Sequence, residues 1–331
     1  MILTRKNLLG PLLVSLALAS VLPSRSTAQP QKNILVVSVA TVGTNDAAEA
    51  GNQVFQQLSQ FSGDFLVDFA RTTQELSQKM TPSALEGYDV VVFQNTMGDL
   101  PLPDTNGFFN WIASGKAFLA IHTGAAAYPT SGSGTFPNYP PYATVLGASM
   151  PGHAGQRTVT VVTRDTIHPS TRHLSPSLKV YDEIYLHANV QWGVVHELFG
   201  MATNPQTGVA QDYPLAWCRF YGSGRVLCSS LGHRVQTWQQ AWFQQHILGA
   251  IRWLLKLDRA LVPTLVPDQP PFTGSAFGFS YAAAAVETYT VQTSDDLFNW
   301  NPVFTNSAPS NTTFRIQYPG GDRHFYRVLC R

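Results

Sequence analysis

Four side chains suited to proton transfer or metal binding occur at separate places in this sequence: His122, His153, Glu183 and His233. His122 follows a short apolar run and precedes Thr123 and a glycine. A histidine in such a position can act as a general base, coordinate a metal or form a structural hydrogen bond. Three imidazoles and one carboxylate would suit zinc. Because no two of them form a close ligand motif such as HExxH, the sequence leaves these roles open.

Two adjacent carboxylates in the middle of the chain compete for a place in such a site. Asp182 and Glu183 are neighbours, so on a strand their side chains point to opposite faces and only one can enter. We expect Glu183 to enter. In the alternative interpretation, Asp182 caps a turn and Glu183 forms an ion pair with Arg157 or Arg225.

The segments before and after His122 indicate how these side chains are positioned. Apolar runs predict strands at residues 33–40, 65–69, 89–94 and 116–121. Apolar residues at helical spacing predict helices at 45–61, 73–80 and 104–115. This alternation predicts an α/β fold with right-handed βαβ units and a doubly wound, mainly parallel sheet. Ligands of such sheets bind at the carboxyl ends of the strands, where His122 should lie.

The second half of the chain has a different pattern. Alternating runs predict strands at 157–163, 180–186, 215–220 and 225–229, followed by a closing helix at 238–257. The segment 128–142, rich in Gly, Pro and Tyr, is expected to be a loop. Residues 259–274 contain several prolines and predict a linker. Short β-like runs between turn residues in 275–331 predict a small C-terminal antiparallel β-sandwich.

The N-terminus predicts export from the cytoplasm. A basic start, an apolar stretch and a small-residue triplet ending at Ala28 are typical of a cleaved signal peptide over residues 1–28. We therefore expect a secreted or periplasmic protein with no stable membrane span after cleavage. Charged residues make up only 12% of the chain and the net charge is +1, which argues against nucleic acid as a partner.

The three cysteines suggest one disulfide, because an exported protein meets an oxidising compartment. Cys218 and Cys228 flank a turn signal and are symmetric about Ser223. We expect them to face each other across a hairpin and to form a disulfide, which would leave Cys330 unpaired.

Several motifs follow one another in a characteristic order. They are Phe118-Leu119-Ala120-Ile121-His122, Asp182-Glu183-Ile184-Tyr185, Gly222-Ser223-Gly224-Arg225-Val226 and Leu231-Gly232-His233. Their order and spacing resemble the ThuA-like family, named for trehalose utilisation, over residues 33–257. The resemblance implies a flavodoxin-like core shared with class I glutamine amidotransferases, and a role in the catabolism of disaccharides or their keto derivatives. Many relatives carry a histidine after the first strand, whereas this chain reads Thr41-Val42-Gly43-Thr44-Asn45-Asp46.

The resemblance also implies which residues form the site. His122 occupies the position where an amidotransferase has its nucleophilic cysteine, and no cysteine lies in the first half of the chain, so glutamine amidotransferase chemistry is excluded. The family topology brings the other candidates toward His122. The expected catalytic residues are His122, Glu183 and His233; the expected substrate contacts are Asn95, Thr123, Tyr185 and His153; and the expected ligands in an alternative, metal-binding role are His122, His153 and His233.

Two functions remain open from the sequence. The first is an enzyme, a hydrolase or lyase acting on glycosides or keto-glycosides, with proton transfer at His122 and Glu183 and with a divalent metal such as zinc as a possible cofactor. The second is a non-catalytic sugar-binding or scaffold protein in which Trp192, Tyr185 and Tyr128 stack on sugar faces. The expected organisation is a signal peptide (1–28), a ThuA-like domain (29–258), a linker (259–274) and a C-terminal β module (275–331).

Overall fold

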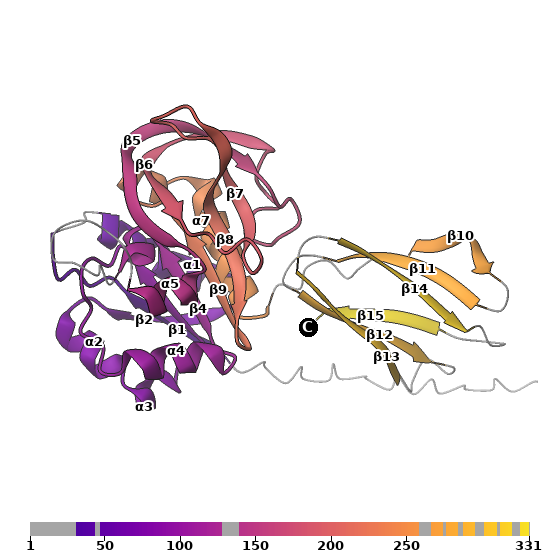
Figure 1. Cartoon of the computed structure of the whole chain (residues 1–331). Coiled ribbons are helices and arrows are strands. Elements are labelled where there is room, and N and C mark those ends of the chain that lie inside the picture. Colours follow the sequence, from indigo (N-terminus) through magenta and orange to yellow (C-terminus); the bar gives the residue numbers. More distant parts are fainter. Residues whose placement is uncertain are drawn as a thin grey trace, which may run out of the picture. The chain divides into compact units, whose positions relative to one another are not determined.

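The computed structural model describes most of the chain, and Figure 1 labels most of its helices and strands. The described residues are 31–43, 47–127, 139–257, 266–273, 276–283, 287–294, 301–309, 312–319 and 325–330. The expected signal peptide and residues 128–138 of the expected loop lie outside this set. Within these ranges, no helix combines the length and the apolar character needed to cross a membrane.

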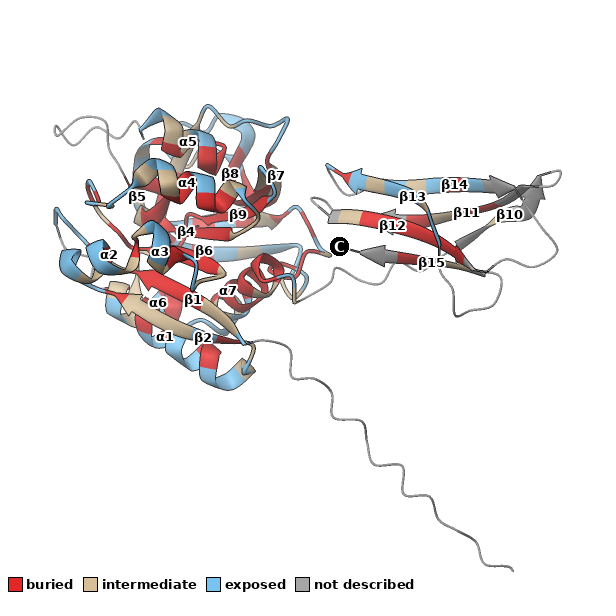
Figure 2. Ribbon diagram, turned by 90° about the horizontal axis from the view of Figure 1, so that it is seen from below, coloured by how far each residue is buried: buried red, intermediate tan, exposed pale blue. Residues whose placement is uncertain are grey.

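The main sheet has nine strands in the order β2-β1-β3-β4-β9-β8-β7-β5-β6. Its first five strands are parallel: β2 (Phe65–Ala70), β1 (Lys32–Val37), β3 (Val90–Gln94), β4 (Ala117–Ile121) and β9 (Gly224–Ser229). The other four join antiparallel: β8 (Ala210–Tyr221), β7 (His196–Thr203), β5 (Ser149–Thr163) and β6 (Ser177–Ala188). Every residue of β3, β4 and β9 is buried, and Figure 2 shows this core in red. The predicted α/β class, with a mostly parallel mixed sheet, is confirmed.

Helices cover both faces of the sheet, because alternate residues of each central strand point to opposite sides. On one face lie α1 (Ala47–Ser62), α6 (Val235–Trp238) and α7 (Ala241–Leu254). On the other lie α2 (Thr73–Lys79), α3 (Pro82–Leu85), α4 (Thr105–Ala113) and α5 (Pro140–Leu146). Val92 of β3 packs with the first group and Phe93 with the second. The start of α5 at Pro140 corrects the expectation that the loop extends to residue 142, since proline is well suited to the first turn of a helix.

The hairpin formed by β8 and β9 contradicts the predicted disulfide. Its turn has two residues, so it is not centred on Ser223. Cys218 therefore lies opposite Leu227, and Cys228 lies opposite Trp217. Because successive residues alternate between faces, this shift of one position places the two thiols on opposite sides of the sheet. Both cysteines are buried, and they are not bonded to each other.

The sheet is strongly curved in its antiparallel half. In the strand order, β6 is five places from β4, which in a flat sheet would separate them by about 24 Å. Yet the hydroxyl of Tyr185 in β6 lies 3.3 Å from the imidazole of His122, directly after β4. Figure 1 shows β5 and β6 curving at the end of this half. The curl brings the last strand of the sheet to the carboxyl end of a central one.

The C-terminal region contains two three-stranded antiparallel sheets, in the orders β10-β11-β14 and β13-β12-β15. Their strands are β10 (Val266–Thr273), β11 (Ala276–Ala283), β12 (Glu287–Ser294), β13 (Asn301–Ala308), β14 (Thr312–Pro319) and β15 (Phe325–Cys330). The small antiparallel sheets agree with the prediction. One buried cluster draws side chains from both sheets, including Tyr281 and Tyr289, whose rings are 5.7 Å apart. Residues 266–273, expected to belong to the linker, are strand β10 and pair with β11.

Candidate active site

His122 occupies a strained position at the carboxyl end of β4. It is fully buried, it begins the short 3₁₀ helix η1 (His122–Ala126), and its φ of 51° lies in the left-handed region that side chains with a Cβ rarely adopt. The tight turn packs directly on the neighbouring strand, since a Cβ on Gly124 would come within 2.0 Å of the carbonyl oxygen of Phe93. Strain of this kind persists only where surrounding contacts enforce it, and it is typical of functional sites.

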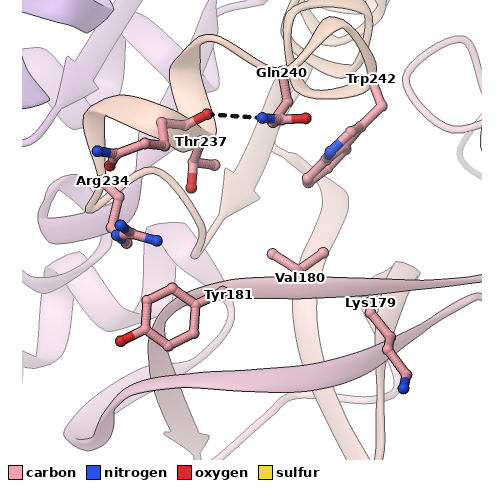
Figure 3. Close-up of a pocket in the computed structure, with 8 residues that line it drawn as sticks. Lys179, Val180, Tyr181, Arg234, Thr237, Gln240 and Trp242 are labelled. Carbon is pink, nitrogen blue, oxygen red and sulfur yellow. Dashed lines mark hydrogen bonds between the residues drawn. The ribbon is translucent and has the colours of Figure 1, made fainter.

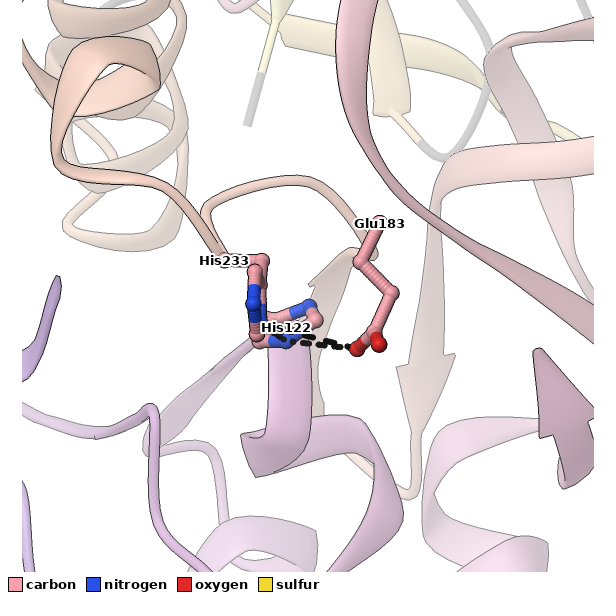
Figure 4. A group of neighbouring side chains, drawn as sticks. All are labelled: His122, Glu183 and His233. Atoms are coloured by element: carbon pink, nitrogen blue, oxygen red, sulfur yellow. Dashed lines mark hydrogen bonds and ion pairs between the residues drawn. The ribbon is translucent and has the colours of Figure 1, made fainter. Parts of the chain in front are cut away.

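The hydrogen bonds of the His122 ring determine which nitrogen is free to react. Nδ1 lies 3.1 Å from the carbonyl oxygen of Ser230. A carbonyl only accepts, so Nδ1 carries the proton and Nε2 presents its lone pair in the neutral ring. Three groups lie close to Nε2: Nδ1 of His233 at 3.1 Å, a carboxylate oxygen of Glu183 at 3.3 Å and the Tyr185 hydroxyl at 3.3 Å. Figure 4 shows His122, Glu183 and His233 converging from separate parts of the chain.

His122, Glu183 and His233 form a close group, called the cluster below. The charges of these side chains follow from their burial and their close contacts. Burial raises the pKa of Glu183, but the hydrogen-bond contact with His122 and the positive charge that His122, His153 and His233 carry when protonated outweigh it, so the pKa is lowered. Glu183 is therefore ionised at neutral pH. Burial, together with the charge of His122, lowers the pKa of His233 despite the opposing effect of Glu183. A carboxylate this close to two imidazole nitrogens requires a shared proton or a cation between them.

The spacing of the three acceptor atoms suits a tetrahedral metal. Nε2 of His122, Nδ1 of His233 and Oε2 of Glu183 are separated by 3.1, 3.3 and 3.5 Å. Ligands about 2.0–2.1 Å from a tetrahedral zinc lie about 3.3–3.4 Å from one another. His153, expected as the third ligand, is instead 43% exposed and contacts the other oxygen of Glu183 at 3.4 Å. Glu183 replaces it in the group, because β6 brings the carboxylate to His122 while His153 lies farther out on β5.

A second layer of hydrogen bonds holds the loop that carries His233. The Gly232 N–H donates to one oxygen of Asp182 at 2.8 Å, and the backbone N–H of Glu183 donates to the other at 2.9 Å. The Gly232 carbonyl accepts from the Asn95 amide at 3.3 Å and from the Trp238 indole at 2.9 Å. Asp182 is thus engaged with the backbone while Glu183 enters the site, as expected. Asn95, expected to contact substrate, is buried and supports this loop.

The comparisons with known proteins identify the family. A family model described as "ThuA: Trehalose utilisation" matches residues 33–254. The chain belongs to the ThuA family. ThuA-like proteins from Parabacteroides merdae ATCC 43184 and Bacteroides uniformis ATCC 8492 share its fold, with TM-scores of 0.54 and 0.53 at 18% and 19% identity. The matches cover 69% and 70% of this chain and 90% and 95% of those chains. No curated protein matches this chain significantly.

The remaining expected residues of the ThuA domain lie around the cluster. Tyr185 is buried, and its ring stacks on that of His122 at 4.5 Å. Burial and the charges of Glu183 and Asp182 raise its pKa well above the usual value, so it stays a hydroxyl donor. The hydroxyl of Thr123, next to His122, is buried and has no hydrogen-bond partner among the described residues.

Two residues near the site of the ThuA domain were not expected from the sequence. Ser230 accepts from His122 through its carbonyl, and its hydroxyl lies 2.6 Å from Nε2 of His187. A signal for His187 was present, because it follows Glu183 and Tyr185 at intervals of two and so shares a strand face with them.

The aromatic residues expected to stack on sugars are not brought together as a binding platform. The Tyr185 ring is covered by His122, and Tyr128 lies outside the described residues. Trp192 is 51% exposed. His196 pairs with Asp165, so it is satisfied away from the cluster. The non-catalytic alternative therefore gains no specific support from this arrangement.

Proposed function

We propose that this ThuA-family chain is an enzyme that acts on a carbohydrate, as a hydrolase or lyase of disaccharides or their keto derivatives. The observation that carries the proposal is the convergence of His122, Glu183 and His233, whose acceptor atoms approach within 3.5 Å of one another. Shared protons or a bound cation can occupy the space between these atoms. The strained turn at His122 and the hydrogen bond from the Gly232 N–H to Asp182 hold the side chains in this arrangement. The family's association with trehalose utilisation supports a sugar as the substrate class.

The geometry favours a metal-assisted form of this chemistry. His122, His233 and Glu183 would hold a zinc ion with one position open, and a bound zinc would polarise a sugar oxygen or acidify a water. The Tyr185 hydroxyl lies 3.3 Å from His122 Nε2, so it would be close enough to donate to an oxygen bound at the zinc. The Thr123 hydroxyl, which has no hydrogen-bond partner among the described residues, is available for a sugar hydroxyl. The hydrogen bond from His122 Nδ1 to Ser230 fixes the ring that would bind the ion.

A metal-free form uses the same residues. The lone pair of His122 Nε2 would accept a proton from the substrate, and the Glu183 carboxylate would stabilise the imidazolium at 3.3 Å. The Tyr185 hydroxyl at 3.3 Å and Nδ1 of His233 at 3.1 Å both lie within hydrogen-bond distance of His122 Nε2, so protons can be exchanged at this nitrogen. These contacts support the metal-free form.

We also propose that the protein works outside the cytoplasm, in accord with the signal-like residues 1–28.

We propose in addition that the C-terminal module is a β-sandwich. The buried side chains that its two sheets share support this fold.

The test combines metal content with turnover. Purified protein is incubated with a panel of disaccharides and their keto forms, with and without chelator, and products are read by mass spectrometry. We expect turnover of at least one sugar and about one zinc per chain, both lost in Glu183→Gln and His122→Ala. Loss of a general acid or base lowers the rate by about 10²- to 10⁴-fold. Glu49→Gln, which changes an exposed carboxylate of α1, is the matched control.

The outcomes separate the candidates. Full turnover in chelator by a metal-free protein would exclude the metal-assisted form and leave proton transfer by His122. Turnover of His122→Ala within about threefold of the parent would refute the site altogether, because that margin is far below the cost of losing a general base.

A further inference from the structure

A pocket of about 270 Å³ lies beside the cluster and has no role in the chemistry described above. Residues of β6, α6 and the start of α7 line it, among them Lys179, Tyr181, Arg234, Gln236, Gln240 and Trp242. Figure 3 shows Trp242 across the pocket from Tyr181 and Arg234. The volume is at the small end of ligand pockets, which suits one compact unit of a ligand.

The pocket is next to the cluster along two segments of chain. Tyr181 precedes Glu183 by two positions in a stretch of β6 that pairs regularly with β5. Their side chains therefore share a face and emerge about 7 Å apart. Arg234 directly follows His233. A ligand of two linked units that places one unit in the pocket would therefore place the other at the cluster.

The lining carries positive charge without compensation. Lys179 and Arg234 are both cationic, and none of the described residues that line the pocket carries a carboxylate. In the part of the chain that the structure describes, neither side chain has a hydrogen bond or an ion pair. The guanidinium of Arg234 lies 4.5 Å over the Tyr181 ring, which orients it but satisfies none of its donors. The ammonium group of Lys179 and the guanidinium of Arg234 are together complementary to a carboxylate or a sulfate group.

The other lining groups are those that recognise a sugar ring. Tyr181 is 47% exposed, and Trp242 is half-buried on the facing side. Such rings offer an apolar face to the C–H groups of a pyranose, while the amides of Gln236 and Gln240 can bond hydroxyls. We propose that this pocket is a subsite for an anionic sugar unit, a uronate or a sulfated pyranose. The inference rests on the proposed function, and it narrows the substrate to saccharides with a charged unit next to the reacting one.

The test measures binding and does not require turnover. D-glucuronate, glucose 6-sulfate, D-glucose and inorganic sulfate are titrated into the parent and into His122→Ala, and dissociation constants are obtained by ligand-observed NMR. We expect the charged sugars to bind about tenfold more tightly than glucose in both proteins, as one charge-assisted hydrogen bond implies. Arg234→Gln and Lys179→Gln should abolish this preference. Arg71→Gln is the matched control, because Arg71 lies 4.6 Å over the Phe69 ring beside β2 at the opposite edge of the sheet.

The aromatic contribution is tested separately. Trp242→Ala should weaken binding of both charged sugars, whereas Trp192→Ala, which removes an exposed tryptophan outside the pocket, should not.

Each outcome decides a defined point. Preference for only one charged sugar identifies the group as carboxylate or sulfate and supports the inference. Equal binding of glucose and the charged sugars overturns it, as does inorganic sulfate binding as tightly as the sugars, which would indicate an anion site alone. Because His122→Ala is included, a charge preference would persist even if the proposed chemistry at His122 were wrong.

Discussion

The carboxylate of Asp182 joins β6 to the loop that carries His233, and Asp182→Asn tests the importance of this link directly. Its two oxygens each accept one backbone N–H, from Gly232 and from Glu183, and the side chain is fully buried. An asparagine of the same shape has a single acceptor oxygen, so one of the two N–H groups would face an NH₂ group.

The magnitude follows from these two contacts. A hydrogen bond to a charged group contributes about 1.5–3 kcal/mol, and a buried donor without an acceptor costs about 1–3 kcal/mol. We therefore expect Asp182→Asn to lower the free energy of unfolding by about 3 kcal/mol, which corresponds to a Tm lower by about 6–12 °C for a domain of this size. Because Gly232 precedes His233, the variant should also bind zinc more weakly.

Urea unfolding and metal titration supply the two readouts. The control is Asp64→Asn, which weakens a partly exposed ion pair with Arg252 at 2.7 Å and should cost less than about 1 kcal/mol. Equal unfolding free energies for the two variants would refute the role assigned to Asp182.

Two further predictions concern the core. Cys218 and Cys228 are buried and are not bonded to each other, so a thiol reagent should label neither in the native protein and both after denaturation without reductant. Labelling that needs prior reduction would restore the predicted disulfide. Burial lowers the pKa of His246 to about 4, against the opposing effect of its hydrogen bond to the Ser170 carbonyl. Its folded pKa is below the unfolded value, so stability is highest above pH 6.5 and should fall by roughly 3 kcal/mol as the pH decreases to 4. Urea unfolding of His246→Gln should lack this contribution, and identical pH slopes would contradict it.

The parallel half of the fold was accessible from the sequence because its signals are local. Strands β3 and β4 are short apolar runs that are buried on both faces, and Asp104 caps α4 through the Gly107 N–H, as expected for its start. Strand β7 was missed, since it begins with His196 and contains a glycine. Which residues of β8 and β9 lie opposite each other depends on whether the turn has two or three residues, and the composition of the turn does not distinguish the two lengths.

The side chains of the candidate site could be predicted from residue type and position in the sequence, but the main-chain groups that orient them could not. His122 was identified by its position after a buried strand and Glu183 by alternation against Asp182. The acceptor that orients His122 is the main-chain carbonyl of Ser230, which leaves no mark on the sequence. The role of Asn95 depends on a loop 137 positions away in the chain, so the residue was assigned to the substrate and not to the scaffold.

The curl of the main sheet has a consequence for how the protein becomes functional. The contacts that define the site join residues 63 and 111 positions apart, so they form only after large loops have closed. Contacts at such separations are slow to form, whereas neighbouring βαβ units can assemble earlier. We expect zinc uptake during refolding to lag behind the recovery of helical circular dichroism; simultaneous recovery would contradict this order. Metal occupancy would then count only those molecules that have folded to completion.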